Sequence, residues 1–173
     1  MIRKATIDDI PAISAIYEAI LDREDAGTLS VGWRRGIYPT AETAKAAISA
    51  GEMYVAVEDG AVVASARINR EQMPAYAQVP WRWPAPDDKV LVMHTLTVDP
   101  ALARRGLARQ FLRFYEDLAR ETGCQVLRID TNARNGIARA MYARHGYVES
   151  GVIPCTFNGI PGVNLVCMEK KLD

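Results

Sequence analysis

Hydrophobic and polar residues follow one another in short segments that predict a mixture of strands and helices. Apolar residues spaced three and four apart predict helices over residues 8–21, 40–50, 106–122 and 136–145. Segments rich in β-branched residues predict strands over residues 2–6, 53–57, 61–68, 90–98, 126–131, 147–152 and 164–170. The Asp59-Gly60 pair between two of these strands predicts a tight hairpin.

Capping residues support the predicted helix ends. Thr6 or Asp8 can cap the first helix, and Thr40 can cap the second. The resulting order, βααβββαβαββ, mixes hairpin and helical connections. It predicts an α/β fold of the α+β type, in which a central mixed sheet of six to seven strands carries about four helices on its faces.

One domain spanning residues 1–173 is expected, because no repeat, linker or low-complexity tract interrupts the chain. Two long irregular segments, residues 33–39 and 69–89, contain all three tryptophans. Loops of this length in a compact domain are more often functional than incidental. The alternative is a surface flap held by its own aromatic side chains, so whether residues 69–89 form a substrate lid is left open.

Composition and charge argue against several classes of function. The 21 basic residues balance the 21 acidic ones, so neither nucleic acid nor an anionic membrane is expected as a partner. No signal peptide and no apolar run long enough to span a bilayer is visible. The three cysteines and two histidines lack metal-ligand spacing. We therefore expect a cytoplasmic protein without a metal site.

The most informative segment is residues 98–108, VDPALARRGLA, where a predicted strand turns into the longest amphipathic helix. Free backbone N–H groups at a helix N-terminus attract anions, and arginines beside them add positive charge. Gly106 and Ala108 leave room for a phosphate to approach the backbone. The segment has neither the P-loop nor the dinucleotide-binding pattern, and helix capping alone would also explain it.

Two motifs in order resemble the GCN5-related N-acetyltransferase (GNAT) family. Residues 103–108 are similar to its motif A, Gln/Arg-x-x-Gly-x-Gly/Ala, although Ala103 stands at the first position. Residues 135–147, NGIARAMYARHGY, are similar to its motif B, with Asn135, Ala138, Tyr142 and Gly146 at the motif positions. The order of predicted elements along the whole chain also resembles that family, which implies a GNAT-like fold.

The resemblance implies acetyl-CoA as co-substrate and assigns roles to individual residues. Backbone groups of Leu96, Thr97 and Val98 would bind the pantetheine arm and the thioester carbonyl. The pyrophosphate would be held by the consecutive residues Arg104, Arg105, Gly106, Leu107, Ala108 and Arg109. Asn135 would contact the cofactor arm, although it is also a good helix N-cap. Tyr142 would lie near the sulfur as general acid, although its spacing also fits a core aromatic.

A general base is expected because an alkyl ammonium with a pKa of ~10.4 must lose a proton before it can attack, at a cost of roughly 4.6 kcal/mol at pH 7. Asp130 ends the strand before motif B, and His94 lies on the strand before motif A. Either residue could accept the proton, and either could instead be a structural residue with a satisfied partner. Water alone or Glu71 is the remaining alternative.

The sequence therefore predicts an N-acetyltransferase in which a primary amine attacks acetyl-CoA directly through a tetrahedral intermediate. No cysteine lies in either motif, so no covalent enzyme intermediate is expected. The alternative is a non-catalytic acyl-CoA-binding or sensory module. The acceptor, a small-molecule amine or a peptide amine, is not specified by the sequence, and a homodimer is left open.

Overall fold

Seven strands form a single sheet in the computed structural model, which describes residues 1–173. The strands are β1 (Ile2–Lys4), β2 (Met53–Glu58), β3 (Ala61–Asn69), β4 (Val90–Val98), β5 (Val126–Asn132), β6 (Val148–Phe157) and β7 (Ile160–Lys171). Their spatial order is β1-β2-β3-β4-β5-β7-β6. Neighbouring strands are antiparallel except for the parallel pair β4 and β5. The predicted mixed sheet is confirmed.

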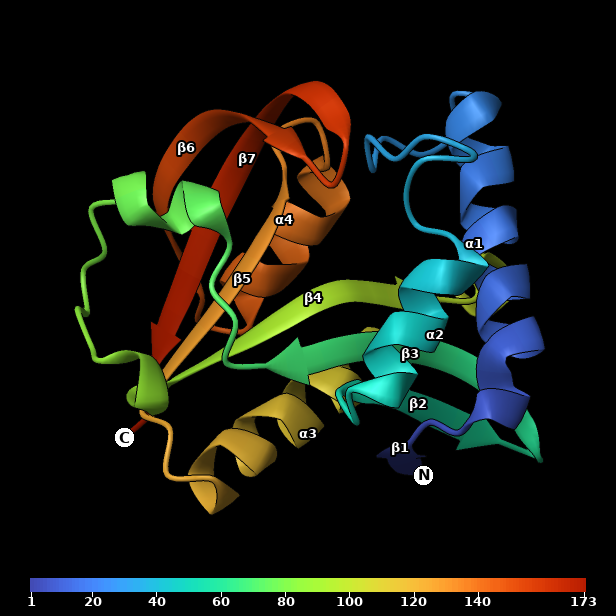
Figure 1. Cartoon of the computed structure of the whole chain (residues 1–173), viewed down its shortest axis with the longest axis horizontal. Coiled ribbons are helices and arrows are strands. Elements are labelled where there is room, and N and C mark those ends of the chain that lie inside the picture. Colours follow the sequence, from blue (N-terminus) through green and yellow to red (C-terminus); the bar gives the residue numbers. More distant parts are fainter.

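Four α-helices cover the two faces of this sheet, as predicted (Figure 1). They are α1 (Ile10–Asp25), α2 (Ala41–Ser49), α3 (Leu107–Glu121) and α4 (Gly136–Arg144). Helices α1 and α2 pack on one face, over β2, β3 and β4. On the other face α3 packs against β3, β4 and β5, and α4 contacts β6. None of these helices combines the length and the apolar character needed to cross a membrane.

The parallel strands β4 and β5 separate soon after they pair. Val90–Met93 of β4 pair with Val126–Ile129 of β5, and the two strands share no ladder beyond these four residue pairs. The hydroxyl of Tyr115 on α3 bridges the paired part by donating to the carbonyls of Leu91 at 2.6 Å and Arg128 at 3.0 Å. Beyond it, β5 and β7 turn away from β4, which opens the sheet into a wedge (Figure 1).

A β-bulge in β4 lies within this wedge. Opposite β3, His94 pairs with Arg67 and Thr97 pairs with Ser65, so β4 carries one extra residue between these pairs. Thr95 takes up the irregularity with a φ of 54°, in the left-handed region that β-branched residues rarely adopt. Bulges of this kind change the direction in which a strand presents its side chains and backbone groups.

The hairpin of β6 and β7 is longer than the sequence predicted. The predicted strands, residues 147–152 and 164–170, extend to meet at the turn formed by Asn158 and Gly159, both with positive φ. This turn has the same chemistry as Asp59-Gly60, which the sequence analysis did identify. Pro154 argued against a longer β6 in the sequence, because proline usually interrupts a strand. The structure tolerates it because β6 is an edge strand.

The segment between β3 and β4 packs against the sheet. Its Trp81 ring lies over the Arg128 guanidinium, 3.9 Å from ring centroid to Cζ. The buried carboxylate of Glu169 on β7 accepts hydrogen bonds from the backbone N–H groups of Arg82 and Trp83. Aromatic packing and these hydrogen bonds therefore hold the segment in place.

Candidate active site

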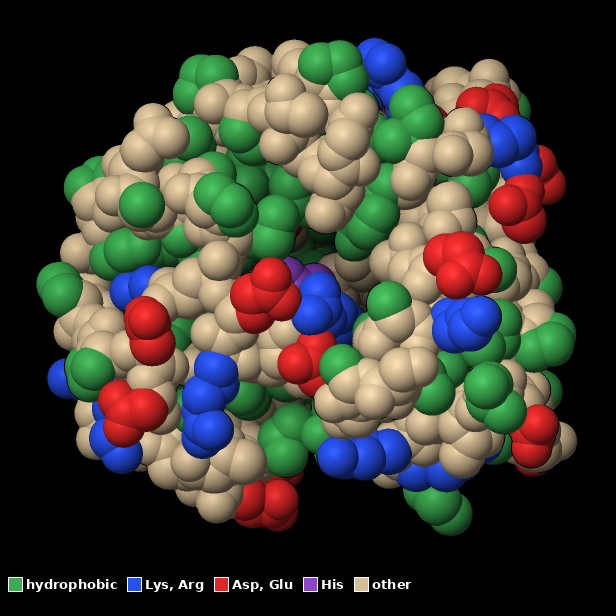
Figure 2. All heavy atoms as spheres, viewed as in Figure 1, with side chains coloured by type: hydrophobic (Ala, Val, Ile, Leu, Met, Phe, Trp, Pro, Cys, Tyr) green, Lys and Arg blue, Asp and Glu red, His purple; other side chains and the backbone are tan.

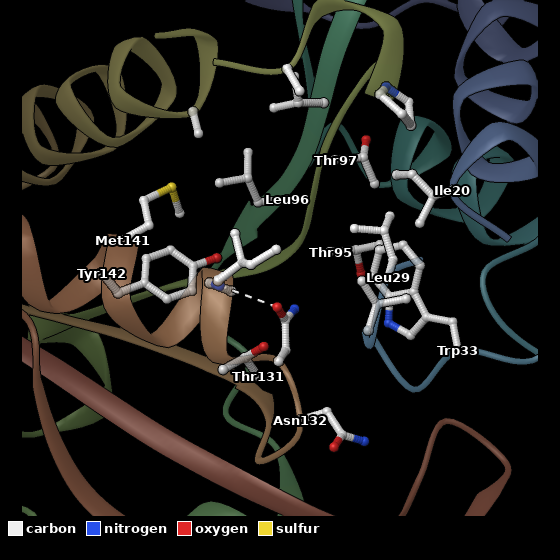
Figure 3. A pocket seen from close by; sticks show the side chains of 18 of the residues that line it. Ile20, Leu29, Trp33, Thr95, Leu96, Thr97, Thr131, Asn132, Met141 and Tyr142 are labelled. Carbon is white, nitrogen blue, oxygen red and sulfur yellow. Dashed lines mark hydrogen bonds between the residues drawn. The ribbon is translucent and has the colours of Figure 1, made fainter. Parts of the chain in front are cut away.

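A cavity of about 810 Å³ occupies the opening between β4 and β5 (Figure 3). Its walls come from the end of β4, the loop into α3, the end of β5, helix α4, and the segment that follows α1. Most of the residues predicted to bind the cofactor line this cavity together. They are Leu96, Thr97, Val98, Arg104, Gly106, Leu107, Ala108, Arg109 and Asn135.

The first turn of α3 presents unpaired backbone donors at the cavity wall. Gly106 is the N-cap residue, with a φ of 82°, and a Cβ at this position would meet no atom within 4 Å. The N–H groups of residues 106–109 have no backbone or side-chain acceptor, whereas Gln110 already bonds back to Gly106. Arg104 and Arg109 add positive charge to the same wall. This combination of donors and charge suits an anion.

Arg105 lies apart from the other residues of this loop. Its guanidinium forms an ion pair with Glu58 at the end of β2, at 3.5 Å, and it does not line the cavity. The side chain was predicted to bind the cofactor together with Arg104. The structure instead directs it toward the β2–β3 hairpin.

The end of β4 offers a free backbone edge to the cavity. Because β5 has already separated, residues 95–98 have no ladder partner on the side that faces β5. On the other side β3 pairs with Thr97 and Val98 beyond the bulge, and the Thr97 hydroxyl is 2.7 Å from that of Ser65. The bonded side keeps the strand rigid, so the free side is available for a ligand in extended conformation.

Tyr142 lies across the cavity from the residues that follow α1, and its ring projects from α4 toward β4 (Figure 3). The side chain is buried at 6% exposure and packs edge-on against Tyr147. Its hydroxyl has no hydrogen-bond partner in the protein. Burial, and then the charge of Asp130, raises the pKa of this phenol. Asn135 caps the same helix by accepting a hydrogen bond from the N–H of Ala138 at 3.1 Å.

Asp130 lies at the point where β4 and β5 diverge. One carboxylate oxygen accepts a hydrogen bond from the Tyr76 hydroxyl at 2.8 Å. Burial raises the pKa of this carboxyl to about 6, and the Tyr76 hydrogen bond offsets part of that shift. A carboxylate with a pKa near neutrality is suited to accept and release protons.

A second cavity of about 400 Å³ opens on the face covered by α1 and α2, and it shares Tyr38, Thr95, Asp130 and Phe157 with the larger one. Figure 2 shows this face hollowed near its centre, with histidine atoms at the floor and charged side chains at the mouth. His94 lines this second cavity and not the first. Glu71 lines neither cavity.

His94 is held in one orientation by a neighbouring amide. Its Nε2 lies 2.9 Å from the Asn69 side-chain oxygen, and the Asn69 nitrogen donates to Glu52 at 2.9 Å. Because that carboxylate can only accept, the amide oxygen faces the imidazole, and Nε2 carries the proton. Burial, and then the charge of Arg67, lowers the pKa of His94 to about 4.

Several cavity residues were not identified from the sequence. Thr95 gave no signal, because a bulge cannot be read from strand periodicity. Gly32 allows a close contact: a Cβ there would lie 2.2 Å from the side-chain nitrogen of Asn132, which brings the segment after α1 against the end of β5. Phe157 lines both cavities because the β6–β7 hairpin is long. The Asn158-Gly159 pair in the sequence was the signal that could have predicted this hairpin.

Comparisons with known proteins agree with this architecture. A sequence model of the acetyltransferase (GNAT) family matches residues 16–147. A GNAT family acetyltransferase from Streptococcus agalactiae 2603 superposes with a TM-score of 0.81 at 24% identity, covering 100% of this chain and 95% of the other. An acetyltransferase from Salmonella typhimurium, solved with its cofactor acetyl-CoA, superposes with a TM-score of 0.71 at 20% identity, covering 100% and 94% of the two chains.

An N-acetyltransferase from Staphylococcus aureus Mu50 superposes with a TM-score of 0.74 at 20% identity, covering 100% of this chain and 98% of the other. No curated protein sequence matches the chain. At these identities the superpositions establish the fold alone, whereas the family model covers more than half of the sequence. On that match, the protein belongs to the acetyltransferase (GNAT) family.

Proposed function

We propose that the protein is an acetyl-CoA-dependent N-acetyltransferase in which a primary amine attacks the thioester directly, through a tetrahedral intermediate. The observation that carries this proposal is the junction of the two cavities at Thr95 and Asp130. Two substrates that enter from opposite faces of the sheet would meet at this point. The larger cavity has the anion-binding wall and is therefore the side for acetyl-CoA.

The residues of the larger cavity fit that co-substrate. The free N–H groups of residues 106–109, with Arg104 and Arg109 beside them, would hold a pyrophosphate. The free edge of β4 at residues 95–98 would bind an extended arm in the manner of an added strand. Acetyl-CoA supplies an acetyl group activated as a thioester. Backbone N–H groups on that edge would stabilise negative charge that develops on its carbonyl oxygen.

Tyr142 is the general acid of this proposal. Its hydroxyl is free of protein partners and borders the larger cavity. The raised pKa keeps the phenol protonated near neutral pH, so the proton that the departing sulfur needs is present. A protein that only bound acyl-CoA would not need a hydroxyl on this part of the cavity wall, which favours an enzyme over a sensory module.

Asp130 is the general base of this proposal, acting directly or through a water molecule. It borders both cavities, whereas His94 borders only the second. The carboxyl pKa of about 6 is also closer to neutrality than the imidazole pKa of about 4, so Asp130 is the stronger base at pH 7. The side-chain hydrogen bond from Tyr76 leaves the second carboxylate oxygen free to accept the proton.

Gly106→Trp should abolish the stabilisation of the protein by acetyl-CoA, because an indole at this position would block the free amides. A ligand at about 100 times its Kd adds roughly 2.7 kcal/mol, or roughly 5–10 °C in Tm for a chain of this size. Thermal melts with and without acetyl-CoA measure the effect. Gly123→Trp is the control, since it adds the same left-handed strain at the other end of α3. Equal Tm shifts in both variants would refute this binding site.

Tyr142→Phe should lower kcat by roughly 10²–10⁴-fold, because it removes the proton donor and keeps the ring. CoA thiol release measures turnover, and the acetyl-CoA melt shift should be unchanged. Tyr54→Phe is the matched control: Tyr54 packs against Phe114 outside both cavities. If the kcat of Tyr142→Phe stays within about twofold of the wild-type kcat, Tyr142 is a packing residue and not the general acid.

The pH profile of kcat/KM should identify the base. Below the pKa of the acceptor amine, log kcat/KM rises by one per pH unit, because the amine must be neutral. Below pH 6 the slope should increase to two, since Asp130, with a pKa of about 6, must also lose a proton. Asp130→Asn should lower kcat/KM by roughly 10²–10⁴-fold, and its plot of log kcat/KM against pH should keep a slope of one throughout. A break near pH 4 that survives in Asp130→Asn would assign the role to His94 instead.

A further inference from the structure

The charged side chains that line the second cavity are one cation and one anion, Arg67 and Asp130. They belong to one row of residues that crosses three strands. Arg67 on β3 pairs with His94 on β4, and His94 stands beside Asp130 because the preceding residues, Met93 and Ile129, are paired. All three side chains face the same side of the sheet, and the imidazole between the two charges is neutral near pH 7.

The guanidinium of Arg67 is fixed so that part of it remains free. Its Nε donates to Glu52 at 2.7 Å and its Nη2 donates to Glu71 at 2.8 Å. Neither carboxylate lines the cavity. The remaining nitrogen, Nη1, has no partner in the protein. An arginine oriented in this way can donate to an anionic group without first losing side-chain freedom.

Tyr17 on α1 supplies a second unused donor. The side chain is 1% exposed and lines the same cavity, and its hydroxyl, which lies near the Ser65 hydroxyl, forms no hydrogen bond of normal length. Buried polar groups without partners are rare in proteins, and a bound ligand is one explanation for them. At the other end of the row, Asp130 has one oxygen bonded to Tyr76 and no cation paired with it. An ammonium group of a ligand could form an ion pair with the free carboxylate oxygen.

The rest of the second cavity is mainly apolar. Besides Tyr17, its aliphatic, thioether and aromatic side chains are Ala46, Ala47, Met53, Met73, Phe157 and Tyr38. The cavity thus combines hydrogen-bond donors at one end, a carboxylate at the other, the neutral imidazole of His94 between them, and apolar side chains around them. A ligand that matches it has an amine, an anionic group and an apolar substituent on one small framework.

We infer that the acceptor is a free amino acid with an apolar side chain. Its amine lies at Asp130, where the two cavities meet, and its carboxylate accepts from Arg67 and Tyr17. This inference rests on the proposed function, since it names the acceptor of the same reaction. A peptide N-terminus lacks the adjacent carboxylate, and a diamine carries in its place a second ammonium, which cannot accept hydrogen bonds from Arg67 and Tyr17.

The test compares acceptors that differ in the carboxylate alone. The probes are L-methionine, L-leucine and L-phenylalanine, each paired with its amide, and putrescine as the diamine. Calorimetric titration into protein saturated with CoA measures binding without turnover. At least one amino acid should bind ten or more times more tightly than its amide and than putrescine. An amide that binds as tightly as its parent acid, or the absence of binding by all three acids, would overturn the inference.

Two variants test the residues themselves. Tyr17→Phe removes an unpaired hydroxyl and keeps the ring, so it should fold normally and weaken binding of the acid more than of the amide. Arg67→Gln should bring the ratio of acid to amide affinity close to one. Arg70→Gln is the control, because Arg70 is exposed and bonds to the Thr122 carbonyl away from the cavity. An acid-to-amide ratio unchanged in both Tyr17→Phe and Arg67→Gln would contradict the inference.

Failure of this inference can be distinguished from failure of the proposed function. CoA release with putrescine or with the amides, and no preference for the acids, would overturn the acceptor assignment and leave N-acetylation intact. Selective binding of an amino acid without CoA release from acetyl-CoA would support the acceptor site and overturn the catalytic role. Both measurements use the same protein.

Discussion

The parallel pairing of β4 and β5 is the constraint on which the rest of the structure depends. It holds for four residue pairs, supported by Tyr115, and then ends. The separation leaves one edge of β4 unpaired, opens space on both faces of the sheet and exposes the first turn of α3 to that space. Unpaired backbone groups inside a protein are unfavourable unless a ligand or water satisfies them, so this architecture is suited to binding rather than to stability alone.

The same separation places Asp130 where the proposed proton transfer would occur. This residue follows the last position of β5 that pairs with β4, so its carboxylate is enclosed by protein and still reaches both cavities. Burial raises its pKa to about 6, which makes it a usable base near neutral pH. Tyr142 borders the larger cavity and Arg67 borders the smaller one, so the proposed acid, base and acceptor-binding groups lie around a single junction.

Local sequence signals predicted the order of strands and helices, the Asp59-Gly60 hairpin and the position of Gly106 at the start of α3, because each depends on residues close in the chain. Features that depend on distant residues were not predictable. The bulge at Thr95 follows from how β3 and β4 pair, and the ion pair of Arg105 with Glu58 joins two separate loops. The second cavity, with its unpaired Tyr17 hydroxyl, requires α1, β3 and β5 to be assembled first.

The central claim is that both substrates occupy the opening between β4 and β5 at the same time, from opposite faces. Initial rates measured while acetyl-CoA and an amine acceptor are both varied test it most directly. Direct transfer within a ternary complex predicts double-reciprocal lines that intersect. Parallel lines would show that the first product leaves before the second substrate binds, which requires a covalent acetyl-enzyme, and they would contradict this account.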